Sequence, residues 1–562
     1  MSYKITSLTN RIWNVRGGSA CEDIVDILAR NRGIEDVNAF INTSVRNVMP
    51  DPFVFIDMER AVNSIVLAIR NKRRIAILGD YDVDGISSVS IFIKFLERIG
   101  ADHAYSIPSR FNDGYGLSIP NIEKHRDCLI VAVDCGSNSR EELNYVRDNG
   151  IDLIVIDHHK MATVCDGSII VNPHRPDEKG HYQYLCAAGL VFLCIVGVNR
   201  QLREVKFYSN GEEPNLMDYL DMVAIATVCD VVTLAELNRA FVSTGLKVIG
   251  QRKNIGIDAL LFAHKDRAVT SETIAFFLGP RLNASGRMAS ADMGVKLLTT
   301  RNPVEAKEIS LRLEDLNRER QLQEMKIMEE ATQFVKDDLN FICSHNADWY
   351  VGIIGIIAGR LREKYNKPSI IICCDSNGVG KASCRSIEGV DISAVIRRGI
   401  EKGVIISGGG HSMAAGFSMD MSKIDDLLKF LKEDIKYKPS PPELYADCIM
   451  SLDAISIKLV ESMSVLEPFG AGNRYPKFVV PNIKITQAKI VGENHIAFVM
   501  ADDKGNSLRA ISFRSLDTPL GSLILAEKIV PVSLLGTLSI SSWNNQQYVS
   551  FQLEDMAESI KI

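Results

Sequence analysis

The chain has 562 residues, of which 46% are hydrophobic and 24% are charged, a composition that excludes a largely disordered protein. At about 150 residues per domain, this length predicts roughly three to four domains. The 64 Lys and Arg residues against 70 Asp and Glu residues give a net charge of −6, which excludes a uniformly basic nucleic-acid-binding protein and requires any anion site to be local.

The sequence carries no pattern typical of export or membrane insertion. Its first residues, MSYKITSLTNRIW, lack the apolar segment and cleavage site of a signal peptide. Its longest uncharged apolar run, residues 185–198, is too short to span a bilayer. The 12 cysteines include no C-x-x-C pair, which is typical of reduced thiols. We therefore expect a cytoplasmic protein of several domains.

Residues 51–300 are predicted to form a doubly wound α/β domain. Three unbroken apolar runs that end in acids or histidines are predicted strands: residues 74–80, 128–136 and 152–159. The segments between and after them are predicted helices: residues 88–97, 139–147 and 216–227. Strands without a polar face are buried on both sides, as in a parallel sheet covered by helices, and ligands bind at the carboxyl ends of such strands. Residues 1–50 show no clear pattern and are expected to pack on this domain.

A single long helix is predicted over residues 301–338. Asn302 and Pro303 supply an N-cap and a favoured first position, and Glu305 completes an arrangement like a capping box. No Gly or Pro follows before residue 338, while apolar residues recur at helical spacing. Such a helix would be about 54 Å long. It most simply connects two domains, with a coiled-coil dimer as the alternative.

Residues 339–440 show a second α/β pattern, and residues 441–562 are mostly β. The proline-rich residues 438–442 are predicted to be a linker or turn. Beyond them, short alternating runs and a hairpin-turn signal at Asn544-Asn545 predict a small closed β-barrel.

Acids and histidines follow three predicted strands and one predicted helix: Asp80, Asp82, Asp84, Asp134, Asp157, His158, His159 and Asp230. Residues two apart face the same way in an extended segment, and converging carboxylates repel one another unless a cation lies among them. A solvated Asp-rich loop is the alternative interpretation of the first three. A calcium loop is disfavoured because Ile91 occupies the twelfth position, where a Glu is needed.

A carboxylate-rich cage with one or two imidazoles favours Mn²⁺ or Mg²⁺ over zinc. It suits two divalent cations about 3.5–4 Å apart, the arrangement used for phosphoester hydrolysis. The residues therefore predict a two-metal site at the carboxyl edge of the first sheet.

The motifs DYDVDG, VDCG, DHH and ATVCDVV, in this order, resemble motifs I to IV of the DHH phosphoesterase superfamily. Seven more stretches narrow the resemblance to the RecJ family of single-strand-specific 5′→3′ exonucleases: IPSRFNDGYGL, VNPHRPD, LGPRLNASGRMASAD, WYVGIIGIIAGRL, GKASCRS, GGGHSMAAGF and LEPFGAGN. The resemblance implies a DHH domain, a connecting helix, a DHH-associated α/β domain and a C-terminal oligonucleotide-binding (OB) barrel.

The resemblance also implies roles for the acids and histidines. Six residues would be ligands of two Mn²⁺ or Mg²⁺ ions, or immediate partners of such ligands: Asp80, Asp82, Asp84, Asp134, His158 and Asp230. Asp134 would bridge the two ions, His159 would contact the scissile phosphate, and Asp157 would orient a neighbouring histidine. Which of the first two aspartates binds metal directly stays open.

Further residues are predicted to bind the nucleic acid, because guanidinium groups fit phosphate oxygens in a bidentate way. The candidates lie in glycine-rich or turn-rich segments: Arg110, Arg281, Asn283, Arg287, Ser383 and Arg385. By resemblance, Arg110, Arg281, Ser383 and Arg385 would form a pocket for the terminal phosphate, which would impose 5′ polarity.

Gly409, Gly410 and His411 belong to a GGGH motif. Consecutive glycines let backbone N–H groups turn inward as a nest for an anion, with a flexible hinge as the alternative. By resemblance, this motif would grip the nucleic-acid backbone from the far side of a narrow cleft.

We therefore expect a cytoplasmic exonuclease that releases 5′-mononucleotides from single-stranded DNA during repair and recombination. Single-strand-binding protein and a RecQ-type helicase are partners that the resemblance alone implies. One alternative is a DHH phosphodiesterase of short oligonucleotides or cyclic dinucleotides, against which the length and the predicted barrel argue. An inactive DHH replication scaffold is the other, against which the complete set of acids and histidines argues.

Overall fold

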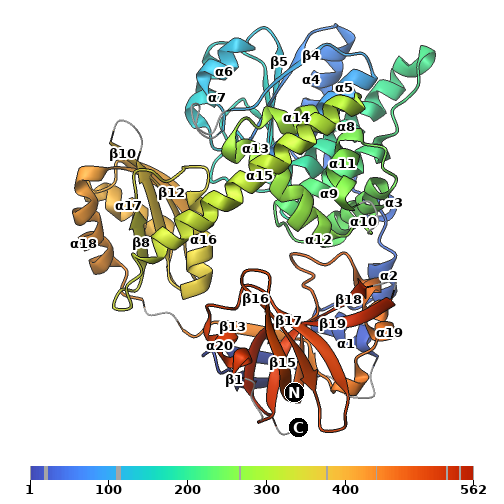
Figure 1. Cartoon of the computed structure of the whole chain (residues 1–562). Helices are drawn as coiled ribbons and strands as arrows, with labels where there is room; N and C mark the ends of the chain where they lie inside the picture. The colour runs from blue at the N-terminus through green and yellow to red at the C-terminus, as the bar shows by residue number, and fades with distance from the viewer. Residues whose placement is uncertain are drawn as a thin grey trace. The chain divides into compact units, whose positions relative to one another are not determined.

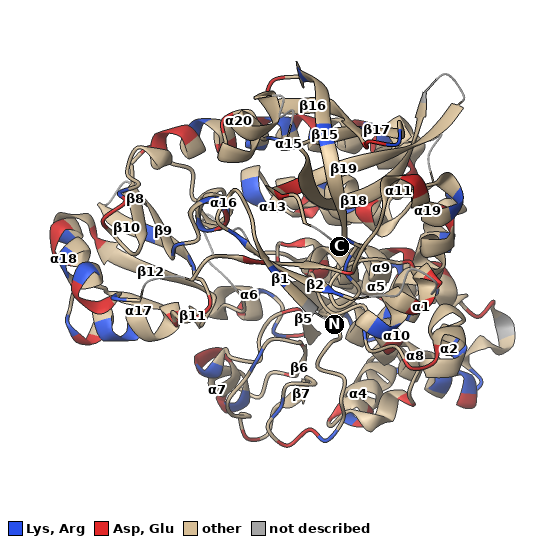
Figure 2. Cartoon of the chain, turned by 90° about the horizontal axis from the view of Figure 1, so that it is seen from below, with Lys and Arg blue, Asp and Glu red and all other residues tan. Residues whose placement is uncertain are grey.

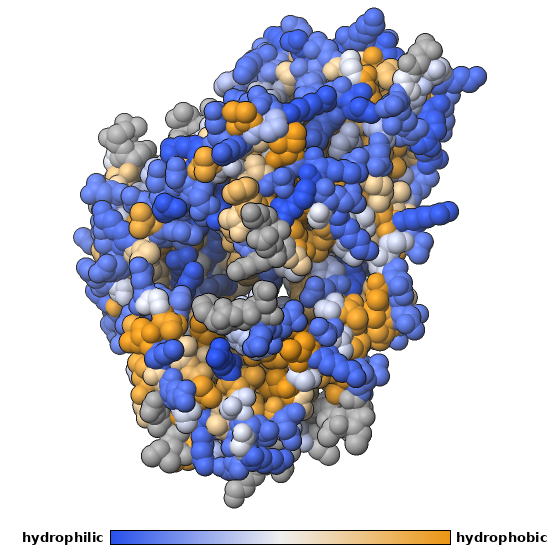
Figure 3. Space-filling view, turned by 45° about the vertical axis from the view of Figure 1, so that its right-hand side comes forward, coloured by the Kyte–Doolittle hydropathy of each residue, from blue (hydrophilic) through white to orange (hydrophobic). Residues whose placement is uncertain are grey.

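The computed structural model describes residues 2–17, 23–108, 116–264, 268–374, 378–437, 440–526, 530–543 and 546–560. The chain divides into two compact units. One is Ser44–Pro439, and the other combines Met1–Thr43 with Ser440–Ile562. Lys, Arg, Asp and Glu are interspersed along the elements, as Figure 2 shows. The face drawn in Figure 3 is mostly hydrophilic, with scattered apolar patches.

The first sheet has the strand order β4-β3-β5-β6-β7 and is parallel throughout. Its strands are β3 (Ile75–Gly79), β4 (His103–Ser106), β5 (Leu129–Val133), β6 (Leu153–Ile156) and β7 (Ile169–Val171). The predicted strands are confirmed, each shorter than the apolar run because the polar residues at its end leave the ladder. The chain places β4 on one side of β3 and β5 on the other, so a topological switch point lies at the carboxyl ends of β3 and β5, where ligands bind in such folds.

Helices cover both faces of this sheet (Figure 1). Alternate strand residues pack on opposite sides: Ile77 and Val131 lie in one apolar core and Leu78 and Ala132 in another. The first core is built with α4 (Met58–Arg70), α5 (Val83–Arg98), α8 (Ala187–Glu204) and α9 (Leu220–Cys229). The second core is built with α6 (Ile119–Lys124) and α7 (Arg140–Asp148).

The remaining helices of this domain include α3 (Val45–Val48), α10 (Glu236–Gly250), α11 (Ile255–Leu260) and α14 (Asp292–Thr299). Another runs without interruption through α12 (Ser271–Thr273), the π-helical turn η5 (Ile274–Leu278) and α13 (Gly279–Met288). Pro280 has no N–H to offer the carbonyl four residues earlier, and the Gly279 N–H instead donates to Ile274 O, five residues earlier. The proline thus accounts for the π turn.

The predicted long helix is α15, but it spans Pro303–Thr332 and ends six residues earlier than expected. Asn302 caps it, its side chain accepting a hydrogen bond from Val304 N at 2.9 Å. At the other end, Ser344 Oγ donates to the carbonyl of Ala331 at 3.0 Å, and Phe334 packs against the Trp349 ring. The helix therefore stops where its end docks on the next sheet.

The second sheet has the order β11-β12-β10-β9-β8, and only its β8–β9 pair is parallel. Its strands are β8 (Ile342–His345), β9 (Ser369–Cys374), β10 (Val379–Arg385), β11 (Ser407–His411) and β12 (Ala414–Asp420). One face packs on α16 (Ile354–Tyr365) and on the end of α15. The other packs on α17 (Ile392–Glu401) and α18 (Ile424–Asp434).

In the second unit, five strands close into a barrel in the order β15-β16-β17-β19-β18, with β18 pairing back to β15. They are β15 (Phe478–Val491), β16 (His495–Ala501), β17 (Ser507–Ser512), β18 (Val532–Trp543) and β19 (Gln546–Glu558). The predicted closed barrel is confirmed. The β18–β19 hairpin pairs Trp543 with Gln546, and the two asparagines between them lie outside the described residues. The barrel is flanked by β14 (Cys448–Ile449), α19 (Ile457–Met463) and α20 (Pro519–Leu525).

The expectation that the N-terminal segment packs on the first α/β domain is wrong for residues 1–43. Their elements are β1 (Ser2–Thr6), β2 (Ile12–Arg16), α1 (Ile24–Asn31) and α2 (Val37–Ile41). Strand β2 pairs with β13 (Glu443–Ala446), and the buried Trp13 ring donates to Asp555 Oδ2 of the barrel at 2.8 Å. These partners lie over 400 residues away in the sequence, so no local pattern could indicate them.

The LEPFGAGN motif also contacts the N-terminal segment, through a hydrogen bond between Asn473 and Arg32. Asn473 is buried and donates through Nδ2 to the carbonyls of Leu466 and Pro468. Its Oδ1 accepts a hydrogen bond from Arg32 Nε at 3.1 Å, and Arg32 also forms an ion pair with Asp447 at 2.9 Å.

Among all the described helices of the chain, none is long and apolar enough to cross a membrane.

Candidate metal centre and phosphate-binding residues

The turn between β3 and α5 carries Asp80, Asp82 and Asp84. Asp82 is the N-cap of α5, and its Oδ1 accepts hydrogen bonds from the amides of Asp84 at 2.9 Å and Gly85 at 3.2 Å. A methyl group at position 85 would lie 2.4 Å from the Asp80 carbonyl oxygen. The D-x-D-x-D-G spacing therefore reflects one tight turn, which only glycine permits, at the switch point of the sheet.

Asp84 lies in the first turn of α5, and its almost fully buried carboxylate meets the start of α8. Its two carboxylate oxygens accept hydrogen bonds from the amides of Ala187 at 2.7 Å and Ala188 at 2.8 Å. The helix N-terminus thus holds this carboxylate in place. Burial raises the pKa of Asp84, the charge of His158 opposes that rise, and the charge of Asp82 adds to it.

Asp134 follows β5 with a φ of 62°, a left-handed conformation that non-glycine residues adopt at a cost. Its carboxylate is buried, and within the described part of the chain its Oδ1 accepts no hydrogen bond. Burial, followed by repulsion from Asp84, Asp82 and Asp80, raises the pKa of Asp134 well above its usual range. A bound cation would remove this repulsion and would give the buried oxygen a partner.

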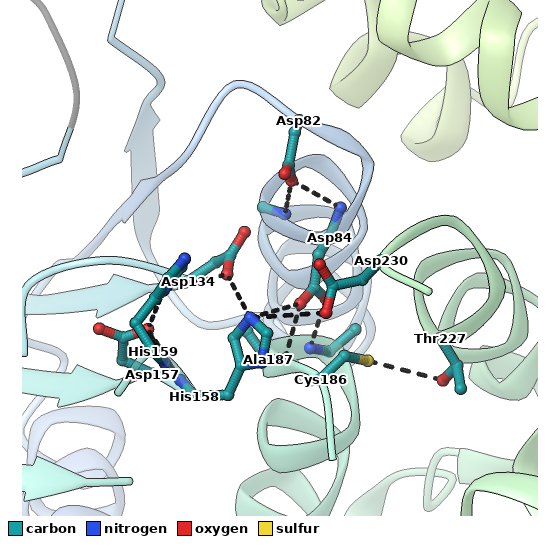
Figure 4. A network of polar contacts seen from close by, with 12 residues as sticks. Asp82, Asp84, Asp134, Asp157, His158, His159, Cys186, Ala187, Thr227 and Asp230 are labelled. Carbon is teal, nitrogen blue, oxygen red and sulfur yellow. Dashed lines mark hydrogen bonds and ion pairs between the residues drawn. The ribbon is translucent and has the colours of Figure 1, made fainter. Parts of the chain in front are cut away.

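His158 stands at the centre of the acids, as Figure 4 shows. Its Nε2 lies 3.3 Å from Asp134 Oδ1, 3.6 Å from Asp84 Oδ2 and 3.7 Å from Asp230 Oδ2. Asp230 comes from the C-terminal end of α9. Burial and repulsion from Asp84 and Asp82 raise the pKa of Asp230 to about 8.

Asp157 forms hydrogen bonds with both histidines that follow it. Its Oδ1 accepts hydrogen bonds from the amides of His158 at 2.7 Å and His159 at 3.1 Å, and from His159 Nδ1 at 2.7 Å. Burial by itself would raise the pKa of Asp157, but the hydrogen bond and charge of His159 hold it well below its usual range. Burial would likewise lower the pKa of His159, but its bond to Asp157 raises that pKa to about 9.

The predicted ligands therefore lie together. Three groups offer ligand atoms within 4.8 Å of one another: Asp80, Asp82 and Asp134; Asp84, His158 and Asp230; and Asp134, His158 and His159. Asp134 and His158 each belong to two of these groups. Oxygen atoms with one or two imidazole nitrogens fit Mn²⁺ and Mg²⁺. Both Asp80 and Asp82 face Asp134, so the question of which binds directly stays open.

The neighbouring thiols of Cys135 and Cys229 belong to none of these three groups. Burial, followed by repulsion from Asp80, raises the pKa of Cys135 well above its usual range. Burial and repulsion from Asp82 and Asp230 likewise raise the pKa of Cys229.

Two glycines of the LGPRLNASGRM motif allow α13 to pack closely against the segments that carry the candidate metal ligands. A methyl group at Gly279 would lie 2.5 Å from Cys229 Sγ, directly before Asp230. A methyl group at Gly286 would lie 2.3 Å from the carbonyl oxygen of Tyr81, between Asp80 and Asp82. Sequence reasoning assigned this motif to the substrate alone and missed this role. The seven-residue spacing, which puts both glycines on one helix face, was the available signal.

The arginines of the same motif have partners within the protein. Arg281 Nε lies 2.5 Å from Glu314 Oε2 of α15, and its guanidinium lies 3.6 Å from the centre of the Phe277 ring. Arg287 Nη1 donates to the carbonyl of Gly352 at 3.2 Å. Asn283 is half-buried on α13. Arg110 lies outside the described residues.

Ser383 and Arg385 lie two apart on β10 and therefore share a face of the sheet. A methyl group at Gly355, in the first turn of α16, would lie 3.0 Å from Ser383 Oγ and 3.7 Å from Arg385 Nη2. Helix α16 has no side-chain cap, and its first turn lies beside a hydroxyl and a guanidinium. This combination suits a phosphate group.

The GGGH motif does not form the expected nest. Residues 407–411 are an exposed strand, β11, at the edge of the second sheet. Methyl groups at Gly408 and Gly410 would collide with β12, whereas one at Gly409 would meet nothing within 4 Å. These glycines thus let two strands approach, and the motif presents Gly409, Gly410 and His411 from an extended edge.

Three family models match the chain: the DHH family N-terminal domain over residues 74–227, the DHHA1 domain over residues 338–437 and the RecJ OB domain over residues 446–555. A curated relative from Haemophilus influenzae, "single-stranded-DNA-specific exonuclease RecJ", is 31% identical over 515 residues, which cover 87% of this chain and 89% of that protein. The chain belongs to the RecJ family of single-stranded-DNA-specific exonucleases. The Escherichia coli RecJ is 30% identical, over 88% of this chain and 89% of its own length.

Other RecJ proteins are longer or more distant. The Bacillus subtilis RecJ is 29% identical over 93% of this chain, which spans only 66% of that protein. A crystal structure of Thermus thermophilus RecJ in complex with Mn²⁺ has a TM-score of 0.81 and 24% identity, and the match covers 98% of this chain and 80% of that one. The same protein in complex with Mg²⁺ matches with a TM-score of 0.76. These structural matches confirm the expected fold.

Proposed function

We propose that this protein hydrolyses single-stranded DNA from its 5′ end and releases 5′-mononucleotides, with two divalent cations, Mn²⁺ or Mg²⁺, bound at the carboxyl edge of the first sheet. The observation that carries this proposal is the convergence of Asp84, Asp134 and Asp230 on His158 Nε2, within 3.3–3.7 Å. Buried acids in such excess need cations. The RecJ relatives and their metal-bound structures support both the reaction and the metals.

When bound, a pair of divalent cations polarises a phosphate and lowers the pKa of a coordinated water. The chain's own residues do the rest. Asp80, Asp82, Asp84, Asp134, His158 and Asp230 would be the ligands of these cations or the immediate partners of such ligands. Asp157 accepts the hydrogen bond from His159 Nδ1, which leaves His159 Nε2 for an oxygen of the scissile phosphate. The hydrogen bond to Asp157 raises the pKa of His159, which favours a ring that can donate a hydrogen bond to an anionic substrate.

The 5′ polarity comes from a terminal-phosphate pocket made of Ser383, Arg385 and the first turn of α16, with Arg110 and Arg281 as further members. Helix α13 links this pocket to the metal centre through two consecutive residues. Gly286 lies against Tyr81 of the metal loop, and Arg287 bonds to Gly352 just before α16. The distance between the two subsites is therefore fixed by the protein, and a substrate anchored at its end is cut at one place.

The OB barrel and β11 would hold the rest of the strand. We further propose a cytoplasmic role in DNA repair and recombination, with single-strand-binding protein and a RecQ-type helicase supplying single-stranded substrate. Family resemblance alone supports these partners. A pull-down with each purified partner tests them one at a time.

One assay tests the central proposal. Single- and double-stranded DNA, labelled at either end and with or without a 5′-phosphate, is incubated with Mn²⁺, Mg²⁺ or a chelator. We expect mononucleotides from the 5′ end of single strands only, and none with the chelator. Degradation from the 3′ end, or dinucleotides hydrolysed in preference to long strands, would instead support a short-oligonucleotide phosphodiesterase. A protein that neither binds Mn²⁺ nor cuts DNA would be a scaffold.

A further inference from the structure

The VNPHRPD segment, residues 171–177, has no part in the function proposed above. One of its side chains nevertheless forms a hydrogen bond with the backbone of His159, beside the candidate metal centre. Asn172 directly follows β7 and is fully buried. Its Nδ2 donates to Ser137 Oγ at 2.8 Å and to the carbonyl oxygen of His159 at 2.9 Å. Its Oδ1 accepts a hydrogen bond from the amide of His174 at 2.7 Å.

These partners fix the orientation of the Asn172 amide group. The backbone N–H of His174 can only donate, and the backbone carbonyl of His159 can only accept. The side chain cannot be turned over without losing both bonds. Arg175, three residues on, anchors the segment through ion pairs with Asp57 at 2.5 Å and Asp177 at 2.8 Å. Asn172 is therefore held from both sides.

The bonds of Asn172 complete a ring that joins the ends of three neighbouring strands. Ser137 lies in the turn that begins with Asp134 after β5, and its amide donates to Asp157 Oδ2 at 3.0 Å. Asp157 follows β6 and binds the amide and the ring of His159. Asn172, after β7, binds the carbonyl of His159 and the hydroxyl of Ser137. The amide, the ring and the carbonyl of His159 thus each have a fixed partner.

We infer that Asn172 is a positioning residue for hydrolysis, because it fixes the peptide of His159 so that the ring reaches the scissile phosphate. This inference rests on the proposed function. The side chain of Asn172 forms no hydrogen bond with the carboxylates around His158. We therefore expect Asn172 to affect the hydrolysis step rather than metal binding. Partners that orient groups in contact with the reaction typically contribute about 10–100-fold to affinity or rate, and a displacement of about 1 Å can cost as much.

The sharpest variant is Asn172→Asp, which keeps size and shape. In its ionised form, the new carboxylate can still accept the hydrogen bond of His174, but it has no proton to donate to the carbonyl of His159. We expect kcat on 5′-phosphorylated single strands to fall about 10–100-fold, while KM and the Kd for Mn²⁺ change less than about threefold. Hydrogen exchange of peptides covering residues 157–160, measured without metal or DNA, should become faster.

Two further variants serve as controls. Asn199→Asp changes another buried asparagine, which lies on α8 and whose side chain donates to Glu213 Oε1 and accepts from the Tyr208 hydroxyl. It should lower the melting temperature and leave kcat unchanged. Asn172→Ala removes the same bonds without adding charge, and it replaces Asn172→Asp if that variant does not fold.

A double-mutant cycle with His159→Ala decides how Asn172 acts. In the His159→Ala background, Asn172→Asp should cost no further activity. A second, independent loss there would overturn the inference, as would an unchanged kcat in a folded Asn172 variant. Loss of Mn²⁺ binding with full recovery of kcat at high Mn²⁺ would also overturn it, because Asn172 would then serve metal binding. If the wild type cuts no DNA, the proposed function fails, whereas the hydrogen-exchange result still reports on the Asn172–His159 bond.

Discussion

The carboxyl edge of the first sheet and the candidate phosphate-binding part of the second sheet are organised in opposite ways. At the first, charged groups are buried, face one another at 3.3–3.7 Å and are held by backbone amides. At the second, the polar groups are half-buried on β10 or exposed on β11, and Arg281 of α13 is already paired with Glu314. The first arrangement suits a small cation, whose position must be exact. The second suits its proposed role of accepting and releasing a long anion, because its groups stay accessible.

The largest effect is expected from the acids and His158. Asp82→Ala, Asp134→Asn or His158→Ala should lower hydrolysis by about 10³-fold or more, beyond the 10–100-fold typical of residues that only orient ligands. Each should weaken Mn²⁺ binding, measured by calorimetry, and leave the fold largely intact. Asp221→Asn, a buried acid of the same domain outside the cluster, is the control. Near-normal turnover in any of the three variants would refute the site.

Variants of the bracing glycines should have the next largest effect. Gly279→Ala and Gly286→Ala force the backbone of α13 away from Cys229 and Tyr81, so kcat and Mn²⁺ affinity should fall by about 10–100-fold. Gly250→Ala, at the end of α10, meets no atom within 4 Å and should change neither. If the two α13 variants behave like Gly250→Ala in steady-state kinetics, the bracing role is wrong.

Arg385→Ala should act on the end of the substrate more than on the chemistry. A hydrogen bond to a charged group contributes about 1.5–3 kcal/mol, so kcat/KM for 5′-phosphorylated strands should fall about 10–100-fold. Strands with a 5′-hydroxyl should lose little. Arg398→Ala, which removes an ion pair with Asp434 in the same domain, should be neutral. An equal loss on both kinds of end would make Arg385 a general backbone contact.

Breaking the ion pair between Arg281 and Glu314 should slightly strengthen the binding of single-stranded DNA, whereas the preceding variants weaken activity. Glu314→Gln weakens the partner of the Arg281 guanidinium. Because exposed ion pairs contribute about 0.2–1 kcal/mol, KM for single-stranded DNA should fall by no more than about fivefold. The change should disappear in Arg281→Ala. A higher KM in Glu314→Gln would show that the ion pair holds Arg281 in its binding position.

Asp221 is buried like the acids of the metal centre but lies outside their cluster. Its replacement should therefore leave hydrolysis unchanged. Burial raises the pKa of Asp221 from 3.8 to about 6, so the stability that it contributes is present below pH 3.8 and is lost as the pH rises through 6. Asp221→Asn should therefore match the wild type near pH 4 and be more stable above pH 6, by roughly 3 kcal/mol. Urea unfolding at several pH values measures this difference. A variant less stable than the wild type at pH 7 would show that the ionised carboxylate is stabilising.

Sequence patterns predicted the first region well because its determinants are local. Each ligand candidate stands at the end of an apolar run, and parallel strands bring such ends to one edge. The bracing of the metal loops by Gly279 and Gly286 was open to prediction from their spacing, but it was missed because a glycine-rich arginine motif fits phosphate binding equally well. The interpretation of GGGH as a nest failed because its partner strand, β12, decides its conformation.

By itself, the sequence determined the α/β class, the long helix, the closed barrel and the set of acids and histidines that meet, since periodicity and strand ends encode all of them. Only the tertiary structure decided that residues 1–43 join the barrel through β13 and Asp555, that α15 ends at Thr332, and that Arg281 binds Glu314. These outcomes depend on contacts between segments far apart in the chain. Their energy comes from burial and pairing, which no local pattern records.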